Sequence, residues 1–466
     1  MNSININKNI IELEYAVRGP IPQRAAILKQ QGRKIIPCNI GNPQALGQKP
    51  LTYYREVLSL LENPSLIQKA RTYLNKSNFV SNYAIEISEN LLEKLETGLG
   101  AYTDSKGQLF IRESVANFIN RRDNVDSNSK SQFANPDNIF LTDGASEGAK
   151  AVLELLITGK NDGIMIPIPQ YPLYSATIQR CGGTQINYYP DEENDWALDK
   201  NMLNFSIQKA KKNDINVKAI VVINPANPTG AILDKNSIIE VIEFAEQHNL
   251  AIIADEVYQE NLYGAEFISF AKAIGNRQIT LFSLHSVSKG FYGECGQRGG
   301  YLEVRNPPKL ANSSKKFIDL LFKLASVNLC SNTVGQILVY LLTNPPPKNS
   351  DAYITFETEK ETILNDLFEK ATIIKNSFAE MEGVECFGRI GAMYLFPRLN
   401  ILPPNSSDFD YCMNLLEETG LCVVNGSGFG QKSGTHHLRI AFLPSKKLLK
   451  SVLPKWIEFH NKYVVK

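Results

Sequence analysis

The chain has 466 residues, of which 43% are hydrophobic and 21% are charged, and its formal net charge is +1 at pH 7. This composition is typical of a soluble globular protein that is long enough for two domains. A nearly neutral charge gives no electrostatic reason to expect a nucleic acid as partner. No apolar run reaches the roughly 18 residues that a membrane span needs. We therefore expect neither a nucleic-acid nor a membrane partner.

Cysteine and histidine usage bears on redox compartment and metal binding. Seven cysteines are scattered without a CxxC pair, and the five histidines show no spacing typical of metal ligands. An odd number of scattered cysteines is typical of reduced thiols in a cytosol-like compartment. The first 19 residues have no apolar core and little basic bias, so a signal or transit peptide is not expected. We expect a cytoplasmic protein without a bound metal.

The middle of the chain alternates short apolar runs with amphipathic helical patterns. This alternation predicts an α/β fold with a mostly parallel seven-stranded sheet flanked by helices. Several runs are rich in Ile and Val on both faces, as strands covered by helices on two sides should be. The predicted strands are 138–143, 163–169, 184–190, 217–225, 250–258, 279–285 and 299–304.

Breaks in this pattern suggest how the chain divides into domains. The polar stretch 127–132 is a predicted surface loop, and the proline-rich stretch 344–350 is a predicted loop before a long helix at about 351–382. A second, smaller set of strands and helices follows residue 385, and residues 445–466 form a basic amphipathic pattern typical of a solvated helix packed on a domain. We predict an α+β small domain at 341–466, to which an N-terminal segment (1–83) contributes, and a large domain at 84–340.

Ligands of α/β proteins bind at the carboxyl ends of the strands, so the residues that follow each predicted strand are candidates. After 138–143 comes the sequence GASEG (144–148), which opens a helix. Exposed backbone N–H groups and the helix dipole favour a phosphate there, although a plain strand–helix turn capped by Ser146 explains the same residues. After 217–225 comes NPANPTG, in which two Asn–Pro steps favour an extended chain and Gly230 permits a tight turn. Asn227 could aim its amide at a ligand or be merely structural.

Two further strand ends carry ionisable groups. Asp255 follows a buried apolar strand and needs a cation or several donors there, such as a protonated ring nitrogen. Tyr258 could reach the same ligand, whereas an internal Asp–Arg ion pair is the alternative. After 279–285, Lys289 stands beside two serines as a potential Schiff-base nucleophile, because burial and neighbouring positive charge lower a lysine pKa. The S-x-S-K pattern is weak alone; it gains weight because these features occur in the order that one phosphorylated aldehyde cofactor with a basic ring would need.

With these residues the sequence resembles the fold-type I, class I/II aminotransferases that depend on pyridoxal 5′-phosphate (PLP), and among them the alanine aminotransferases. The resemblance extends over nearly the whole chain. The segments that carry it are EYAVRGPIPQRA (14–25), CNIGNPQALGQKPLT (38–52), IPQYPLYSA (168–176), INPANPTG (223–230), DEVYQENLY (255–263), HSVSKGFYGECGQRGGYLEV (285–304), GAMYLFPR (391–398) and GSGFGQKSGTHHLRI (426–440).

The resemblance implies a role for each matching residue. Lys289 would bind the cofactor aldehyde covalently, Asp255 would pair with the pyridine nitrogen, and Tyr258 and Asn227 would hydrogen-bond the oxygen of the ring 3-hydroxyl. Tyr171 would stack on the ring. The phosphate would lie in a cup formed by Ala145, Ser146, Ser286, Ser288 and Arg298.

The resemblance also implies a homodimer with shared active sites and a place for the substrate. Tyr102 would reach the phosphate bound by the partner subunit. Arg439 would clamp the substrate carboxylate, helped by the backbone of Gly41, because a guanidinium binds a carboxylate through two parallel bonds. Arg18 is a candidate for the second carboxylate of glutamate, and a surface ion pair is its alternative.

The implied reaction moves an amino group from L-alanine to 2-oxoglutarate, giving pyruvate and L-glutamate by a ping-pong cycle between PLP and pyridoxamine phosphate. Three alternatives stay open: a glutamate:glyoxylate aminotransferase, a β-lyase acting on cysteine conjugates, and a non-catalytic PLP-binding regulatory protein. Some loop positions depart from the family pattern, with Ala226 where glycine is commoner and Asn425 where proline is expected. The sequence GSGFG (426–430) hints at a dinucleotide loop, but Gln431 occupies the third glycine position, which excludes that interpretation.

Overall fold

The structure is a computed structural model, and it describes residues 4–13, 15, 19–73, 80–125, 133–311 and 313–465. Contacts between residues divide the chain into two compact units. Unit 1 comprises Met1–Gly47, Leu153–Ile268 and Asp366–Lys466, and unit 2 comprises Gln48–Val152 and Ser269–Asn365. The boundaries of these units differ from those of the domains expected at 84–340 and 341–466. The expected domain boundaries stay a prediction.

All seven predicted strands form, and they belong to one sheet with the order β2-β8-β7-β6-β5-β3-β4. Neighbours among β3, β4, β5 and β6 are parallel, whereas β8 runs antiparallel to β2 and β7. This confirms the predicted α/β fold with a mostly parallel sheet. The strands are β2 (Ile139–Thr142), β3 (Asp162–Pro167), β4 (Thr184–Tyr188), β5 (Asn216–Ile223), β6 (Ala251–Asp255), β7 (Leu281–Ser286) and β8 (Gly300–Arg305).

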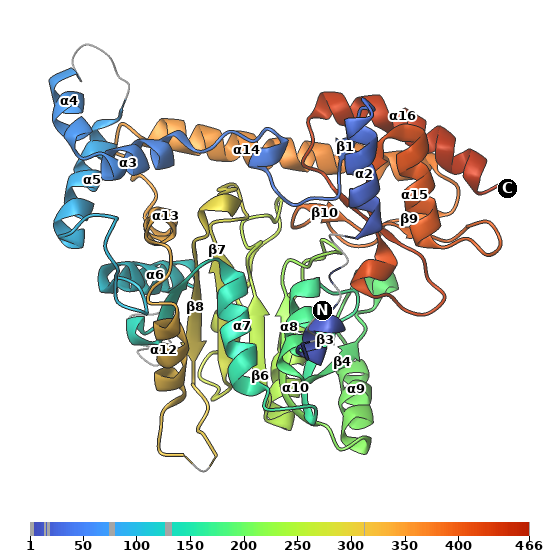
Figure 1. The fold of residues 1–466 in the computed structure, drawn as a ribbon, viewed down its shortest axis with the longest axis horizontal. Helices are drawn as coiled ribbons and strands as arrows, with labels where there is room; N and C mark the ends of the chain where they lie inside the picture. The colour runs from blue at the N-terminus through green and yellow to red at the C-terminus, as the bar shows by residue number, and fades with distance from the viewer. Residues whose placement is uncertain are drawn as a thin grey trace. The chain divides into compact units, whose positions relative to one another are not determined.

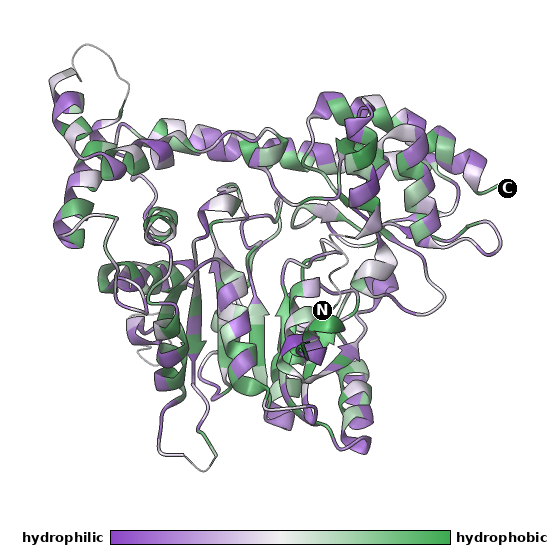
Figure 2. Cartoon of the chain, in the orientation of Figure 1, coloured by the Kyte–Doolittle hydropathy of each residue, from purple (hydrophilic) through white to green (hydrophobic). Residues whose placement is uncertain are grey.

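The strands form because their residues are apolar on both faces. Every residue of β6 and of β7 is buried. In Figure 2 the strands are coloured mostly as hydrophobic, whereas the helices alternate between hydrophobic and hydrophilic residues. This is the pattern of helices that cover a sheet with one face and meet water with the other.

In unit 1, the helices α8 (Pro172–Cys181), α9 (Lys200–Lys212) and α10 (Lys235–His248) flank the strands β3 to β6 (Figure 1). Pro172 stands in the first turn of α8, and Asp234 caps α10 by accepting a hydrogen bond from Ser237 N–H. Both are signals expected at helix starts. Helix α8 contacts β3 and β4, while α9 and α10 contact each other. The chain therefore returns to the same edge of these strands after each helix.

The remainder of unit 1 has short strands and longer helices. The predicted C-terminal helix is α16 (Lys446–Tyr463), whose buried Trp456 donates a hydrogen bond to Tyr411 of α15 (Asp408–Thr419). Two-residue strands are common here, so side chains and loops define much of this part. The other elements are α1 (Lys8–Ile11), α2 (Pro20–Gln30), β1 (Ile36–Pro37), β9 (Val384–Glu385), β10 (Tyr394–Leu395), β11 (Arg398–Leu399), β12 (Leu421–Cys422), β13 (Val424–Asn425) and β14 (Leu438–Ala441).

Unit 2 packs helices around the strands β2, β8 and β7 with a large apolar core that includes Tyr54, Ile111, Val115, Tyr301 and Ile337. The predicted loop at 344–350 is confirmed, and the predicted loop at 127–132 lies outside the described residues. The long helix expected at 351–382 is α14 (Tyr353–Ser377). The other helices are α3 (Thr52–Glu62), α4 (Ser65–Tyr73), α5 (Asn82–Leu95), α6 (Leu109–Arg122), α7 (Ala145–Leu156), α11 (Phe270–Ile274), α12 (Phe317–Val327) and α13 (Thr333–Thr343). Within the described ranges, no helix has the length and apolarity needed to cross a membrane.

Candidate functional site

The predicted site residues fall into two sets. Unit 2 contains Tyr102, Ala145, Ser146, Ser286, Ser288, Lys289 and Arg298, and unit 1 contains Gly41, Tyr171, Asn227, Asp255, Tyr258 and Arg439. Arg18 lies outside the described residues. Across the part of the chain that is described, no three His, Cys, Asp or Glu side chains gather as a potential metal site.

In unit 1, Asp255 ends strand β6 and is 4% exposed. Tyr174 of helix α8 donates a hydrogen bond from its hydroxyl to Asp255 Oδ2 over 2.8 Å. Burial and the charge of Asp255 raise the pKa of Tyr174 well above its usual value, so the hydroxyl stays protonated and donates. The carboxylate is thus held inside the protein by a neutral donor, and a buried negative charge of this kind suits a cationic ligand group.

Arg439 lies on strand β14 and is 2% exposed, and several side chains and one carbonyl of unit 1 contact it. Its Nη1 donates to Asn227 Oδ1 over 3.1 Å, and its Nη2 donates to the carbonyl of Asn39 over 2.7 Å. The guanidinium carbon lies 4.3 Å from the Tyr394 ring centroid and 4.7 Å from that of Phe429. Its Nε has no hydrogen-bond partner among the described residues. A buried donor without a partner is rare, and it marks a place for an anionic group.

Tyr171, Tyr258 and Tyr394 lie near this arginine. Tyr258 donates a hydrogen bond to Tyr394 over 3.3 Å, and Tyr15 donates to Tyr171 over 3.1 Å. Burial is the main cause that raises the pKa of Tyr258 and of Tyr171, and in both cases the Arg439 charge opposes the rise. The phenols are therefore neutral at physiological pH, and each keeps a proton to donate. Unit 1 thus brings Tyr171, Tyr258, Asn227 and Arg439 close together.

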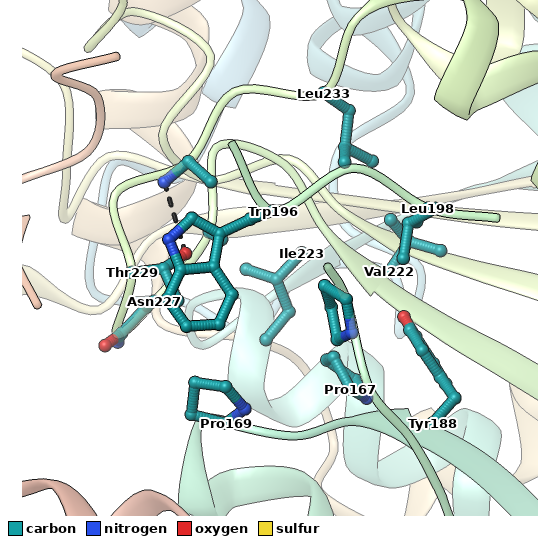
Figure 3. Close-up of a pocket in the computed structure, with 13 residues that line it drawn as sticks. Pro167, Pro169, Tyr188, Trp196, Leu198, Val222, Ile223, Asn227, Thr229 and Leu233 are labelled. Atoms are coloured by element: carbon teal, nitrogen blue, oxygen red, sulfur yellow. Dashed lines mark hydrogen bonds between the residues drawn. The ribbon is translucent and has the colours of Figure 1, made fainter. Parts of the chain in front are cut away.

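The loop that carries Asn227 follows strand β5. Both of its Asn–Pro peptide bonds, Asn224–Pro225 and Asn227–Pro228, are cis. The sequence predicted an extended chain at these two positions and did not predict the cis bonds. A pocket lined mainly by apolar side chains lies behind the loop, and Ala226 is part of its wall. Figure 3 shows Asn227 at the end of this pocket that lies away from Tyr188 and Leu198. The apolar wall therefore supports the loop from behind, while the Asn227 amide reaches Arg439.

Gly230 closes the same loop at a point where two backbones meet. It has φ +72°, and a Cβ there would lie 2.4 Å from the Tyr394 carbonyl oxygen and 3.0 Å from that of Gly391. Because both atoms belong to the backbone, they cannot move aside easily. Glycine at 230 therefore lets the Asn227 loop approach the segment that carries Tyr394.

We expect Gly230→Ala to destabilise the protein by about 2–4 kcal/mol, the sum of left-handed strain and overpacking. Gly264→Ala is the matched control, since Gly264 has φ +97° but a Cβ there would have no other atom within 4 Å. This control should show only the strain, about 1–2 kcal/mol. Urea unfolding of both purified variants measures the difference, and equal losses would contradict the tight backbone approach.

In unit 2, the start of helix α7 meets Arg298. The helix begins at Ala145 directly after the turn that follows β2. Arg298 Nη2 donates to the Asp143 carbonyl over 2.8 Å and lies 3.3 Å from Ser146 Oγ. A Cβ on Gly144 would lie 2.4 Å from Arg298 Nη2, so glycine allows this approach. A guanidinium, a hydroxyl and free helical N–H groups together suit a phosphate.

The remaining candidates of unit 2 lie at the end of strand β7. Ser286 is the register partner of Gly300, and a Cβ on Gly300 would lie 2.9 Å from Ala145 N, so Ser286 ends close to the α7 start. Ser286 and Ser288 are buried, and Ser288 N–H donates to Ser286 Oγ over 3.3 Å. Lys289 follows in the same turn and is half-buried. In contrast, Tyr102 is 78% exposed.

Several residues of the site were missing from the sequence-based prediction. Tyr174, Tyr394 and Phe429 stand in segments that carried the family resemblance, but no role was inferred for them. Asn39 contributes only a carbonyl, which any residue could supply. The GSGFG loop, excluded as a dinucleotide loop, supplies Phe429 to the face of Arg439. A sequence signal existed for the two tyrosines and for Phe429, through their place in the matching segments, but not for the Asn39 carbonyl as an acceptor.

Comparison with known proteins shows the family of the chain. The family model "Aminotransferase class I and II" matches residues 73–453. The chain is 41% identical to a protein named probable mitochondrial alanine aminotransferase from Dictyostelium discoideum, with 99% of this chain and 89% of that protein covered. It is 40% identical to glutamate–glyoxylate aminotransferase 1 of Arabidopsis thaliana, with 98% and 95% covered.

Among solved structures, an alanine aminotransferase from Pyrococcus furiosus superposes with a TM-score of 0.78 at 26% identity, covering 98% of this chain and all of that one. Enzymes of this family depend on PLP. Its phosphate suits the donors around Arg298 and the α7 start, its ring nitrogen suits the buried Asp255, and its ring oxygen suits the hydroxyl of Tyr258. The chain belongs to the class I and II aminotransferases, and it is a PLP-dependent aminotransferase of fold type I.

Proposed function

We propose that the chain is an alanine aminotransferase, which transfers the amino group of L-alanine to 2-oxoglutarate and yields pyruvate and L-glutamate. The relative from D. discoideum supports alanine as a substrate, since a protein named a probable alanine aminotransferase is 41% identical over 99% of the chain. The observation that carries the proposal is the buried Arg439, held between two aromatic rings with an unpaired Nε. All four reactants have a carboxylate beside the reacting carbon, and this guanidinium supplies one place for it.

The proposed roles of the other residues follow from their chemistry. PLP, when bound, supplies an electron sink for the bonds of the substrate Cα. Asp255 holds positive charge on the ring nitrogen through its buried carboxylate, and Tyr258 and Asn227 act on the ring oxygen. Lys289 provides an amine that takes and returns the proton of the substrate Cα. The phosphate is oriented by Ala145, Ser146, Ser286, Ser288 and Arg298, while Tyr171 stacks on the ring and Gly41 offers its backbone to the carboxylate.

Arg439→Lys is expected to lower kcat/KM for L-alanine by roughly 10- to 150-fold, equivalent to about 1.5–3 kcal/mol. Lysine keeps the charge, but it loses the planar fork and the two-sided ring stacking. Steady-state kinetics with alanine and 2-oxoglutarate measure this change. An unchanged kcat/KM would show that the carboxylate binds elsewhere.

The choice of substrates is tested with a panel of donors and acceptors. The proposal predicts the highest kcat/KM for the alanine and 2-oxoglutarate pair. A higher value with glutamate and glyoxylate would replace the proposal with the second candidate, which the relative from A. thaliana favours at 40% identity. Pyruvate release from a cysteine conjugate without an acceptor would indicate a β-lyase instead, and PLP binding without turnover would indicate a regulatory protein. Arg18 as the ligand of the second glutamate carboxylate stays a prediction.

We also propose a homodimer in a cytosol-like compartment. The exposed Tyr102 supports the first part, because a ring that is 78% exposed within its own chain is available to reach a partner subunit. All seven cysteines are free thiols, which supports a reducing compartment. Sedimentation of the purified protein tests the dimer, and fractionation of cells that express the chain tests the compartment.

A further inference from the structure

A buried polar network surrounds His437, two residues before Arg439 in the chain. His437 is 2% exposed, its Nε2 lies 2.8 Å from Glu192 Oε1, and its Nδ1 lies 3.0 Å from Gln431 Oε1. The Gln431 amide has its oxygen toward the ring because its Nε2 donates to Asp408 Oδ2 over 3.2 Å. Each ring nitrogen therefore faces an oxygen acceptor.

This network holds the loop that presents Phe429. Gly426 N–H donates to the His437 carbonyl over 2.8 Å, and Ser427 N–H donates to Asp408 Oδ2 over 2.6 Å. A Cβ on Gly426 would lie 2.6 Å from His437 Cβ and 2.7 Å from Gln431 Oε1, so these side chains pack directly on the loop backbone. The loop is thus fixed by His437 on one side and by the buried Asp408 on the other.

A continuous stack of rings joins His437 to Arg439. The His437 ring lies parallel to Phe396, with centroids 4.8 Å apart and an interplanar angle of 9°. Phe396 meets Phe429 edge to face at 6.2 Å, and Phe429 lies 4.7 Å from the guanidinium carbon of Arg439. Trp196 packs against both Phe396 and His437. Phe429, which contacts the guanidinium, therefore packs against Phe396, and Phe396 in turn stacks on His437.

We propose that His437 is a positioning residue for substrate binding, which acts through Phe396, Phe429 and the 426–431 loop on the orientation of Arg439. The inference rests on the proposed function of Arg439 as the ligand of the substrate carboxylate. Charged groups near His437 are Glu192, Arg398 at 3.8 Å from Glu192, Glu193 beside Arg398, and Asp408 behind Gln431. Because His437 contacts none of the groups assigned to the reacting atoms, its loss affects carboxylate affinity more than the chemical step.

The test uses the PLP-loaded enzyme and glutarate, a dicarboxylate that resembles glutamate without an amino group. We expect His437→Asn to raise the calorimetric Kd for glutarate and the KM for alanine by roughly 5- to 20-fold, the range of coupling within one contact network, with little change in kcat. His436→Asn is the matched control, since His436 is the neighbouring histidine and is only partly buried, whereas His437 is 2% exposed. A His437→Asn enzyme with the same Kd and KM as this control would overturn the proposal.

A double-mutant cycle separates this inference from the function of Arg439 on which it rests. In an Arg439→Lys background, His437→Asn should add less than about a 2-fold loss of glutarate affinity, because the fork it positions is already gone. Full additivity of two large losses would overturn the positioning role and leave the proposed function intact. Normal glutarate affinity in Arg439→Lys alone would overturn the proposed function of the arginine, and the inference with it.

Glu192 variants provide the same test if His437→Asn does not fold. Glu192→Gln keeps an oxygen that accepts from His437 Nε2, whereas Glu192→Ala leaves that nitrogen without its partner. We expect Glu192→Gln to stay within about 3-fold of the parent Kd for glutarate, and Glu192→Ala to raise it by roughly 5- to 20-fold. Equal Kd values for the two variants would contradict the proposal.

Discussion

Lys289→Ala is expected to lower the transamination rate of the PLP-loaded enzyme by at least about 10³-fold. Lys289 stands in the turn after β7, directly behind the buried Ser286 and Ser288, and is itself half-buried. Lys289 is also the one lysine among the predicted site residues. In the proposed mechanism the Lys289 amine moves the substrate Cα proton, so alanine at 289 would remove a group that takes part in the reaction.

The matched control for this experiment is Lys323→Ala, since Lys323 is an exposed residue of helix α12. The control should keep both the parent rate and the yellow chromophore of the loaded enzyme, whereas Lys289→Ala should lose both. Stopped-flow absorbance and pyruvate release measure the two properties separately. A Lys289→Ala enzyme that works within about 10-fold of the parent would rule out this lysine as the base.

Asp255→Asn is expected to lower kcat by roughly 10²- to 10⁴-fold while leaving the fold in place. Asn has nearly the shape of Asp, and its amide oxygen still accepts the Tyr174 hydroxyl hydrogen bond. The substitution therefore removes the negative charge and one acceptor, because the second carboxylate oxygen, which lies 3.4 Å from Val257 N, becomes an amide NH2. In the bound enzyme the Asp255 carboxylate would favour a protonated ring nitrogen, so its loss would weaken the electron sink that PLP supplies.

Tyr174→Phe separates the charge of Asp255 from its hydrogen bond. This variant removes the donor to Asp255 Oδ2 but keeps the carboxylate, so kcat should fall by about 10-fold, the lower end of the roughly 1.5–3 kcal/mol that one hydrogen bond to a charged group contributes. Thermal unfolding of both variants shows whether either loss reflects instability. If Asp255→Asn and Tyr174→Phe lose equal activity, the charge at 255 is not what the reaction needs.

The sheet was predictable from the sequence because its strands are short, apolar on both faces and separated by clear helical patterns. Strands β6 and β7, for example, are buried at every position, which leaves a continuous apolar signal. The candidate residues at strand ends were predictable for the same reason, since a parallel sheet presents its carboxyl ends on one side. Asp255 stood out because a charged residue directly followed such a strand.

The surroundings of Arg439 could not be predicted in the same way. Its contacts come from Asn39, Asn227, Tyr394 and Phe429, which lie in loops, a two-residue strand and a short 3-10 helix far apart in the chain. No periodic pattern records which loop meets which, because tertiary packing decides it. The close approach of Gly230 to Gly391 could not be predicted either, because these two glycines are far apart in the chain and meet only in the folded structure. Resemblance to a family indicated which residues matter, but only the structure shows how they are held.

The most direct test of the central claim is a single half-reaction. The purified, PLP-loaded chain is mixed with excess L-alanine and no acceptor, and pyruvate is quantified against the concentration of protein chains. A ping-pong aminotransferase predicts a burst of about one pyruvate per chain that then stops, and that resumes only when 2-oxoglutarate is added. No pyruvate from alanine, or pyruvate that accumulates without any acceptor, would contradict the account.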